Sequence, residues 1–108
     1  MNALPVTDEL VQVAERIMWF DRPQNALANP ILFLNYAMRY AMPEDMNVIR
    51  RYVSDDDLRE ALVNAHPGII DGRSWAYWHL KLDMYPPPKL PERHLEDVKV
   101  ERAIPRNP

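Results

Sequence analysis

The chain has 108 residues, a formal net charge of -3 and no cysteine. This length predicts one domain that can bury a core without metals or disulfides. The lack of cysteine excludes disulfide frameworks, thiolate metal sites and cysteine nucleophiles. The acidic balance argues against a protein whose main role is nonspecific nucleic-acid binding. No apolar run is long enough to span a membrane and the N-terminus does not look like a signal peptide, so we expect a cytoplasmic protein without a membrane partner.

Two glycines against eleven prolines favour short helices separated by prolines over a β-rich fold. We therefore predict an all-α fold, a compact bundle of about five short helices with an extended Pro-rich C-terminal tail. The expected helices span residues 8–20, 30–41, 44–53, 55–65 and 72–82. Pro23 can also start a short turn of helix through Leu27, because proline is tolerated at the first helical position.

The predicted helices begin at residues that can cap free backbone N–H groups. The side-chain oxygens of Thr7, Ser54 and Asp71 can accept hydrogen bonds from the first turns of their helices. The pair Asn29-Pro30 is the clearest start signal in the chain, with Asn as the cap and Pro as the first helical residue.

Apolar side chains recur at helical spacing through these segments, so each helix is expected to turn one face into a core. Trp19, Phe20 and Tyr40 extend or widen the apolar faces of the first two long helices. The side chains expected in the core are Leu10, Val13, Ile17, Leu34, Met38, Ile49, Leu58, Leu62, Trp75 and Trp78.

The helix expected from Gly72 concentrates rare residue types. Trp75, Trp78, His79 and Leu82 follow the i, i+3, i+4, i+7 spacing of one helix face. A buried tryptophan carries roughly 150–250 Å² into a core, so two of them would dominate a domain this small. The alternative interpretation is that one indole is partly exposed and anchors a partner, because Trp is over-represented at interface hot spots.

The composition changes after residue 84, which divides the chain into a helical domain, residues 1–84, and an extended or disordered Pro-rich tail, residues 85–108. Pro86-Pro87-Pro88 favours an extended segment that leads the tail away from the Trp helix. Val98 and Val100 alternate with charged residues and could add a short strand to the sheet edge of a partner.

No group of residues predicts catalysis, a metal site or a cofactor. The segment Gly72-Arg73-Ser74-Trp75-Ala76 is a near match to a nucleophile elbow, but that motif needs a preceding strand, a large sheet, and acid and histidine partners. His66, His79 and His94 do not stand at metal-ligand spacings. The acidic clusters fall at helix starts, where carboxylates stabilise the helix dipole without any further role.

Arg39, Arg50 and Arg51 form the one local basic group in the sequence. They could contact phosphate, or they could pair with the acidic helix start that follows. A helix-turn-helix around Ser54 would place the three aspartates after it at the start of the recognition helix, where phosphates would repel them. DNA binding by this region is therefore only the alternative hypothesis.

Three segments carry a resemblance: Phe33-Leu34-Asn35-Tyr36-Ala37-Met38-Arg39-Tyr40, Leu58-Arg59-Glu60-Ala61-Leu62, and the stretch from Pro67 to Trp78 with RSWAYW as its most specific part. From about Glu9 to Tyr85 the chain resembles small, poorly characterised bacterial proteins encoded beside nucleotidyltransferase-like proteins of the abortive-infection type. The resemblance implies a toxin–antitoxin module with this chain in the antitoxin position, and it implies no catalytic residue. Glycine is expected after Tyr40 in such proteins, whereas this chain has Ala41.

Two functional hypotheses follow. The first is a non-catalytic, antitoxin-like binder of a nucleotidyltransferase-fold partner, which it contacts through the aromatic helix and the tail; self-association is also open. The partner-binding residues expected on this hypothesis are Trp75, Trp78, Tyr77, Tyr85, Val98 and Val100. The alternative is a helical DNA-binding transcriptional regulator that contacts phosphate through Arg39, Arg50 and Arg51.

Overall fold

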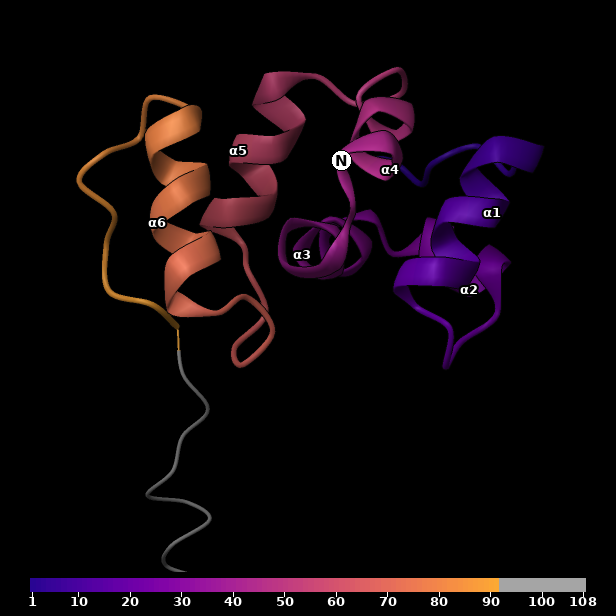
Figure 1. Cartoon of the computed structure of the whole chain (residues 1–108), viewed down its shortest axis with the longest axis horizontal. Helices are drawn as coiled ribbons and strands as arrows, with labels where there is room; N and C mark the ends of the chain where they lie inside the picture. Colours follow the sequence, from indigo (N-terminus) through magenta and orange to yellow (C-terminus); the bar gives the residue numbers. More distant parts are fainter. Residues whose placement is uncertain (92–108) are drawn as a thin grey trace, which may run out of the picture.

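A computed structural model of the chain describes residues 1–91, and within that range the fold is all-α, as predicted (Figure 1). The six helices found in residues 1–91 are α1 (Asp8–Ile17), α2 (Pro23–Ala28), α3 (Pro30–Tyr40), α4 (Pro43–Ile49), α5 (Asp55–Val63) and α6 (Gly72–Lys81). Five of them correspond to the expected long helices, and α2 is the short helix expected from Pro23. The largest differences are at the C-terminal ends of α1 and α4, which stop before the predicted residues.

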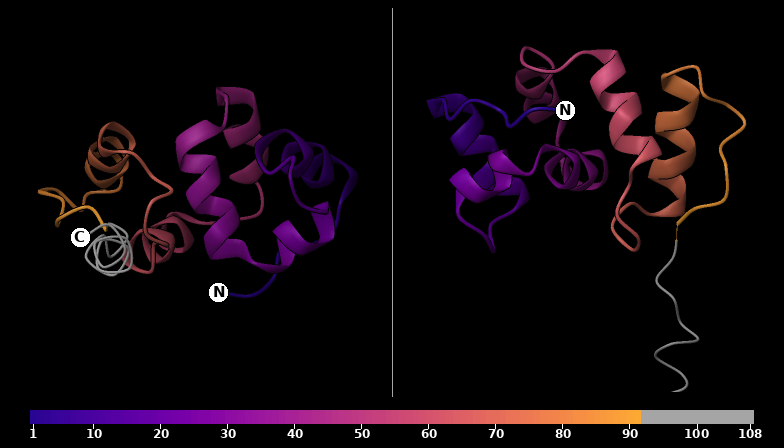
Figure 2. Two further views of the ribbon diagram at one scale, coloured as in Figure 1. Left: turned by 90° about the horizontal axis from the view of Figure 1, so that it is seen from below. Right: turned by 180° about the vertical axis from the view of Figure 1, so that it is seen from behind.

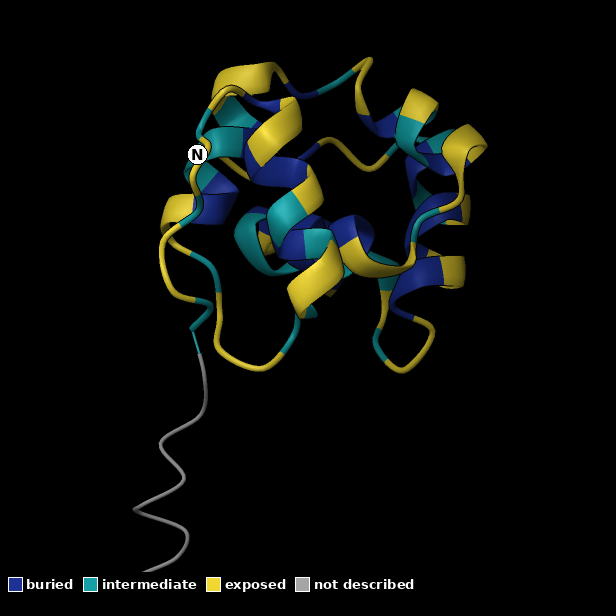
Figure 3. Cartoon of the chain, turned by 60° about the vertical axis from the view of Figure 1, so that its left-hand side comes forward, coloured by how far each residue is buried: buried dark blue, intermediate teal, exposed yellow. Residues whose placement is uncertain are grey.

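Helix α3 is the centre of the bundle. It packs against α1, α2, α5 and α6, while α4 packs against α1. Seen from two directions, α5 and α6 lie on one side of α3, and α1 and α2 lie on the other (Figures 1 and 2). Buried and exposed residues alternate along the helices, so each helix turns one face inward (Figure 3). All ten side chains expected in the core are buried.

The predicted caps at three helix starts are confirmed. Thr7 Oγ1 accepts a hydrogen bond from the amide of Leu10 at 3.3 Å, and Asp71 Oδ1 accepts one from the third residue of α6 at 3.3 Å. At α5 the cap is reciprocal, because Ser54 Oγ accepts from the Asp57 amide at 3.1 Å and the Asp57 carboxylate accepts from the Ser54 amide at 2.9 Å. These bonds satisfy backbone donors that have no partner inside the helices.

The predicted cap at Asn29 is wrong in one respect. Pro30 is the first residue of α3, as expected, but the Asn29 side chain makes no capping bond to that helix. Its amide group instead donates to the carbonyl of Asn25 at 2.9 Å. The reason is that Asn29 also ends α2, and it satisfies a carbonyl of that helix which has no intrahelical partner.

Helix α3 ends at Ala41 without a left-handed residue. Ala41 has φ -67° and ψ 137°, so the chain leaves the helix in an extended conformation that any residue can adopt. The Ala41 amide still closes the last turn on Ala37, while the indole Nε1–H of Trp78 donates to the carbonyl of Met38 at 3.1 Å. A side chain of α6 therefore satisfies a terminal carbonyl of α3, which explains how this helix ends without glycine.

Helix α6 ends in a Schellman motif that turns the chain back on itself. Asp83 occupies the left-handed position with φ 60°, its amide donates to Leu80, and the Met84 amide donates to the carbonyl of His79 at 2.7 Å. From α5, Arg59 Nε donates to the carbonyl of Leu82 at 2.9 Å and holds the same turn.

The prediction that Pro86-Pro87-Pro88 leads the tail away from the Trp helix is wrong. The chain after α6 runs back beside that helix (Figure 1), and the indole Nε1–H of Trp75 donates to the carbonyl of Pro88 at 2.8 Å. Leu90 is partly buried against the core. The indole and Leu90 give this segment one polar and one apolar contact with the domain, which hold it beside the helix. Val98 and Val100 lie outside the described residues.

Candidate functional site

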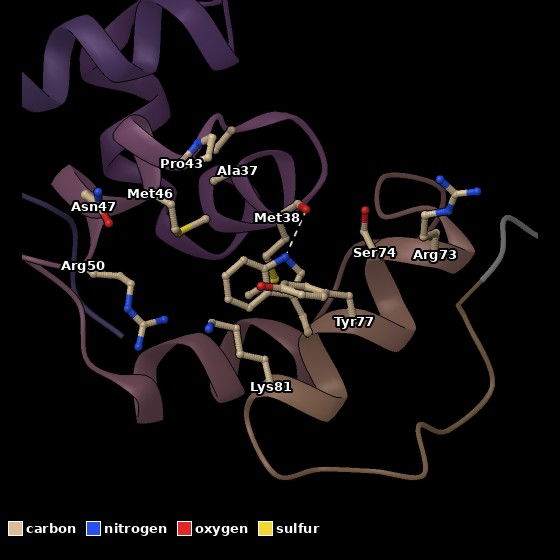
Figure 4. Close-up of a pocket in the computed structure, with 12 residues that line it drawn as sticks. Ala37, Met38, Pro43, Met46, Asn47, Arg50, Arg73, Ser74, Tyr77 and Lys81 are labelled. Atoms are coloured by element: carbon tan, nitrogen blue, oxygen red, sulfur yellow. Dashed lines mark hydrogen bonds between the residues drawn. The ribbon is translucent and has the colours of Figure 1, made fainter.

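A groove of about 600 Å³ lies between the C-terminal half of α3, helix α4 and the exposed side of α6 (Figure 4). Most of its lining is apolar. The apolar and aromatic lining residues are Ala37, Met38, Ala41, Pro43, Met46, Tyr77 and Trp78. Because three helices contribute to it, the groove exists only in the folded bundle.

Two aromatic side chains of α6 form one wall of the groove. Trp78 is buried and fixed by its bond to Met38, whereas Tyr77 is exposed. The Tyr77 ring meets the Trp78 ring edge-on, with centroids 5.3 Å apart and planes at 87°. This T-shaped contact is a favoured aromatic geometry, so the exposed ring is held against a rigid one and the wall is preformed.

In the described part of the chain, the charged side chains that line the groove are all cationic: Arg50, Arg73 and Lys81. Arg50 forms an ion pair with Asp55, whereas Arg73 and Lys81 have no carboxylate partner among residues 1–91. Arg50 and Lys81 extend toward each other at one end of the groove, and Arg73 lies at the other end (Figure 4). In a chain of net charge -3 this is a local concentration of positive charge.

The first turn of α6 is anchored beside the groove. The hydrogen bond from Ser74 lowers the pKa of the Asp71 carboxyl below its usual value, and the nearby guanidinium of Arg39 lowers it further. Asp71 therefore stays ionised to a lower pH than an ordinary aspartate, and its carboxylate caps the turn that carries Arg73.

The structure separates the expected partner-binding residues. Trp75 and Trp78 are both buried, which supports their interpretation as core residues and corrects the alternative of an exposed indole anchor. Trp78 still contributes to the groove wall, and Tyr77 is exposed at its mouth. Tyr85 is exposed but does not line the groove. Val98 and Val100 are not among the described residues.

The three arginines of the alternative hypothesis do not assemble into one basic surface. Arg39 lies 3.7 Å from the carboxylate of Asp71, and Arg50 is paired with Asp55. Arg51 reaches across to Glu9 of α1 at 2.5 Å. Each guanidinium thus faces a carboxylate of the same domain, which reduces the charge available to phosphate.

Arg73, Lys81 and Met46 are groove residues that the sequence did not single out. A signal for the first two was present, because Arg73, Tyr77 and Lys81 stand at i, i+4 and i+8 on one face of α6. No comparable signal marked Met46. Its exposure to the groove depends on how α4 packs, which helical spacing does not determine.

The described part of the chain offers no constellation for metal binding or nucleophilic catalysis. Within residues 1–91 no group of three His, Cys, Asp or Glu side chains could hold a metal ion. His79 is buried, and its Nδ1 donates to the carbonyl of Trp75 at 2.7 Å, so it fills a local structural role. Ser74 has no histidine partner there. None of the helices between residues 1 and 91 is long and apolar enough to cross a bilayer.

Comparison of the chain with family models, with curated proteins and with solved structures yields no match. The function is therefore inferred from the chemistry of the groove.

Proposed function

We propose that this chain is a non-catalytic protein-interaction module whose groove binds an acidic, amphipathic segment of a partner protein. The observation that carries the proposal is the combination of an apolar floor with two cations, Arg73 and Lys81, that have no carboxylate partner within residues 1–91. An anionic ligand with an apolar face would satisfy both features at once.

The floor of the groove suits an apolar side chain of the partner. Met38 and Met46 are flexible and polarisable, so they can adapt to different inserted shapes. Burying one leucine or phenylalanine there is worth about 1.5–3 kcal/mol. The volume lies within the roughly 300–1,000 Å³ range of ligand pockets, and a short amphipathic helix laid in a groove is a common recognition mode.

The cations give the groove a preference for acidic segments over basic ones. Carboxylates on the polar face of the bound segment would lie beside Lys81 and Arg50 at one end and Arg73 at the other. Such exposed pairs contribute little affinity each, but they accelerate encounter and disfavour basic partners.

For the identity of the partner we propose a nucleotidyltransferase-like protein of the abortive-infection type, with this chain acting as its antitoxin in the cytoplasm. The support is the resemblance carried by Phe33–Tyr40 and Pro67–Trp78. Tyr77 of the most specific segment, RSWAYW, lies at the mouth of the groove. The most specific part of the resemblance and the candidate binding surface therefore share a helix.

The test is calorimetric titration of this chain with the protein encoded beside it. We expect Tyr77→Ala, which removes an aromatic wall of the groove, and Lys81→Glu, which replaces an attraction by a repulsion, each to weaken binding at least tenfold, about 1.4 kcal/mol. Lys89→Glu is the matched control, because Lys89 is an exposed lysine outside the groove, and its affinity should stay within about twofold of the parent. If all three variants bind the partner as tightly as the parent does, the groove is not the binding surface.

A second probe tests the chemistry of the groove without the partner. A helical peptide with leucines at i, i+3 and i+7 and glutamates between them should bind, while its twin with lysines in place of glutamates should not. If the acidic peptide binds and the neighbouring protein does not, the groove remains a binding site and the proposed identity of the partner is refuted. Equal binding of both peptides would refute the proposed charge preference.

A further inference from the structure

A second surface of the domain presents a row of aromatic rings, which we call the aromatic row: Trp19, Phe20, Tyr36 and Tyr40. Trp19 and Phe20 follow the end of α1, and the two tyrosines stand one helical turn apart on α3. Trp19 is 77% exposed, Phe20 52% and Tyr40 56%. The row and Arg16 line a shallow groove of about 430 Å³.

The rings of the row hold one another in place. Trp19 and Phe20 meet edge-on with centroids 5.6 Å apart, and Phe20 meets Tyr36 at 5.2 Å. Tyr36 stacks on Tyr40 at 6.3 Å, and the guanidinium of Arg39 lies 5.1 Å from the Tyr40 centroid. The surface is therefore preorganised although it is exposed, which lowers the entropic cost of covering it.

These same contacts argue against single-stranded nucleic acid as the occupant. Bases bind by stacking on free aromatic faces within a basic groove. Here Tyr36 and Tyr40 stack on each other, Arg39 covers Tyr40, and the chain as a whole is acidic. The net charge of -3 likewise opposes an anionic membrane surface.

The charges beside the row have both signs, unlike those of the groove on α6. Arg16 and Arg39 are cations next to the rings, and each is paired within its own chain, Arg16 with Asp45 and Arg39 with Asp71. Asp21 follows Phe20 directly, and Glu44 lines an adjoining pocket with Arg16. Because these cations are balanced by carboxylates, the surface carries little net charge and does not repel a second copy of itself across a two-fold axis.

The exposed area is also sufficient for a second copy. Met42, 60% exposed, joins Arg16 at the edge of the row. At roughly 200 Å² for each fully exposed side chain, Trp19, Phe20, Tyr40 and Met42 offer about 500 Å² per copy. Complete burial of these four side chains in both copies would remove about 1,000 Å², which is the lower limit for a specific interface, and flanking residues would add to it.

We propose that the aromatic row is a self-association surface, and that two copies of this chain pair through it about a two-fold axis. Trp19 is the anchor, since it is the most exposed ring of the row and tryptophan is enriched at interface hot spots. The proposal does not depend on the partner-binding groove, because the residues that line the two surfaces are different.

Sedimentation velocity on the full chain over about 1–500 µM tests the proposal, with a dimer dissociating in the micromolar range as the expected result. Trp19→Glu and Tyr40→Glu should each weaken the dimer at least tenfold. Val63→Glu is the matched control, because Val63 is 72% exposed on α5 and lies outside the row, and it should leave the dimer unchanged. Lys81→Glu should also leave it unchanged.

A measurement on the unmodified chain protects the test against variants that fail to fold. Trp75 and Trp78 are buried, so concentration-dependent changes in tryptophan emission and acrylamide quenching report on Trp19. Emission should shift to the blue and quenching should fall as the dimer forms. A monomer at every concentration, or a dimer that survives both Trp19→Glu and Tyr40→Glu, would overturn the proposal and leave the row to a different protein.

Discussion

Replacing Trp78 is the most direct perturbation of the link between α3 and α6. The indole is buried and donates to the carbonyl of Met38, so it fills the core and closes the end of α3 at the same time. Trp78→Ala removes both contributions and should cost about 3–5 kcal/mol. A domain of this size has a free energy of unfolding of roughly 5–15 kcal/mol, so the variant would be marginally stable or unfolded.

Trp78→Phe retains part of the packing, because it keeps a smaller aromatic ring in the core, and it removes the Nε1–H donor. It leaves the Met38 carbonyl without a partner, which costs about 1–3 kcal/mol in a buried site. Urea denaturation followed by far-ultraviolet circular dichroism measures both variants without relying on tryptophan emission. If Trp78→Phe unfolds at the same urea concentration as the parent, the indole does not close α3 in the way described.

Four further substitutions test the local geometry by thermal or urea denaturation. Ala41→Gly should destabilise the fold by about 0.5–1 kcal/mol, because φ is negative at Ala41 and glycine has more backbone freedom to lose. Asp83→Gly should stabilise the fold by about 1 kcal/mol, because Asp83 has φ 60° and places a negative charge at a helix C-terminus. Asn35→Leu should cost about 2–4 kcal/mol, because this buried amide donates to Ala61 and accepts from the amide of His66, and a variant as stable as the parent would contradict that. The pKa of Asp71 is lower in the folded chain than its usual value of 3.8, so ionised Asp71 stabilises the fold at pH values above 3.8. This contribution is lost as the pH falls through the folded-state pKa. Asp71→Asn should therefore be less stable than the parent at neutral pH and equally stable in strong acid.

The fold could be predicted because its signals are local. Helical spacing identified the buried faces, and a cap such as Ser54 needs only the backbone of its own first turn. The same local reasoning missed the polar contacts between distant segments. Asn35 stands within an apolar helix, and only the packed structure shows that it joins α3 to the end of α5 and to the loop that follows.

The aromatic row was misjudged for a physical reason. Trp19 and Phe20 were assigned to the apolar face of a helix ending at residue 20, but α1 ends at Ile17. Past that point the helical periodicity no longer determines which way a side chain faces. Asp21 accepts hydrogen bonds from the Arg22 amide and from Asn25, and these bonds turn the chain toward α2. The two rings are thereby left on the surface.

The candidate groove could be foreseen only in part. The sequence named Tyr77 and Trp78 as binding residues, and both line the groove. It could not show that α4 would place Met46 opposite them, since that depends on packing between helices far apart in the chain. Nor could it separate paired from unpaired arginines, because the carboxylate that faces Arg51 is on α1.

Two truncations separate the role of the segment after α6 from that of the residues beyond it. Ending the chain at residue 84 removes the Pro88 carbonyl that accepts from Trp75 and the contact of Leu90 with the core, so the free energy of unfolding should fall by about 1–2 kcal/mol. Ending it at residue 91 keeps these contacts, so this form should melt at a higher temperature than the one that ends at residue 84. The form that ends at residue 91 lacks Val98 and Val100. Comparing its affinity for the partner with that of the full chain therefore measures the binding role expected of these two residues. Equal melting of the two truncated forms would contradict the anchoring of this segment by Trp75, and an affinity unchanged by removal of residues 92–108 would assign binding to the helical domain alone.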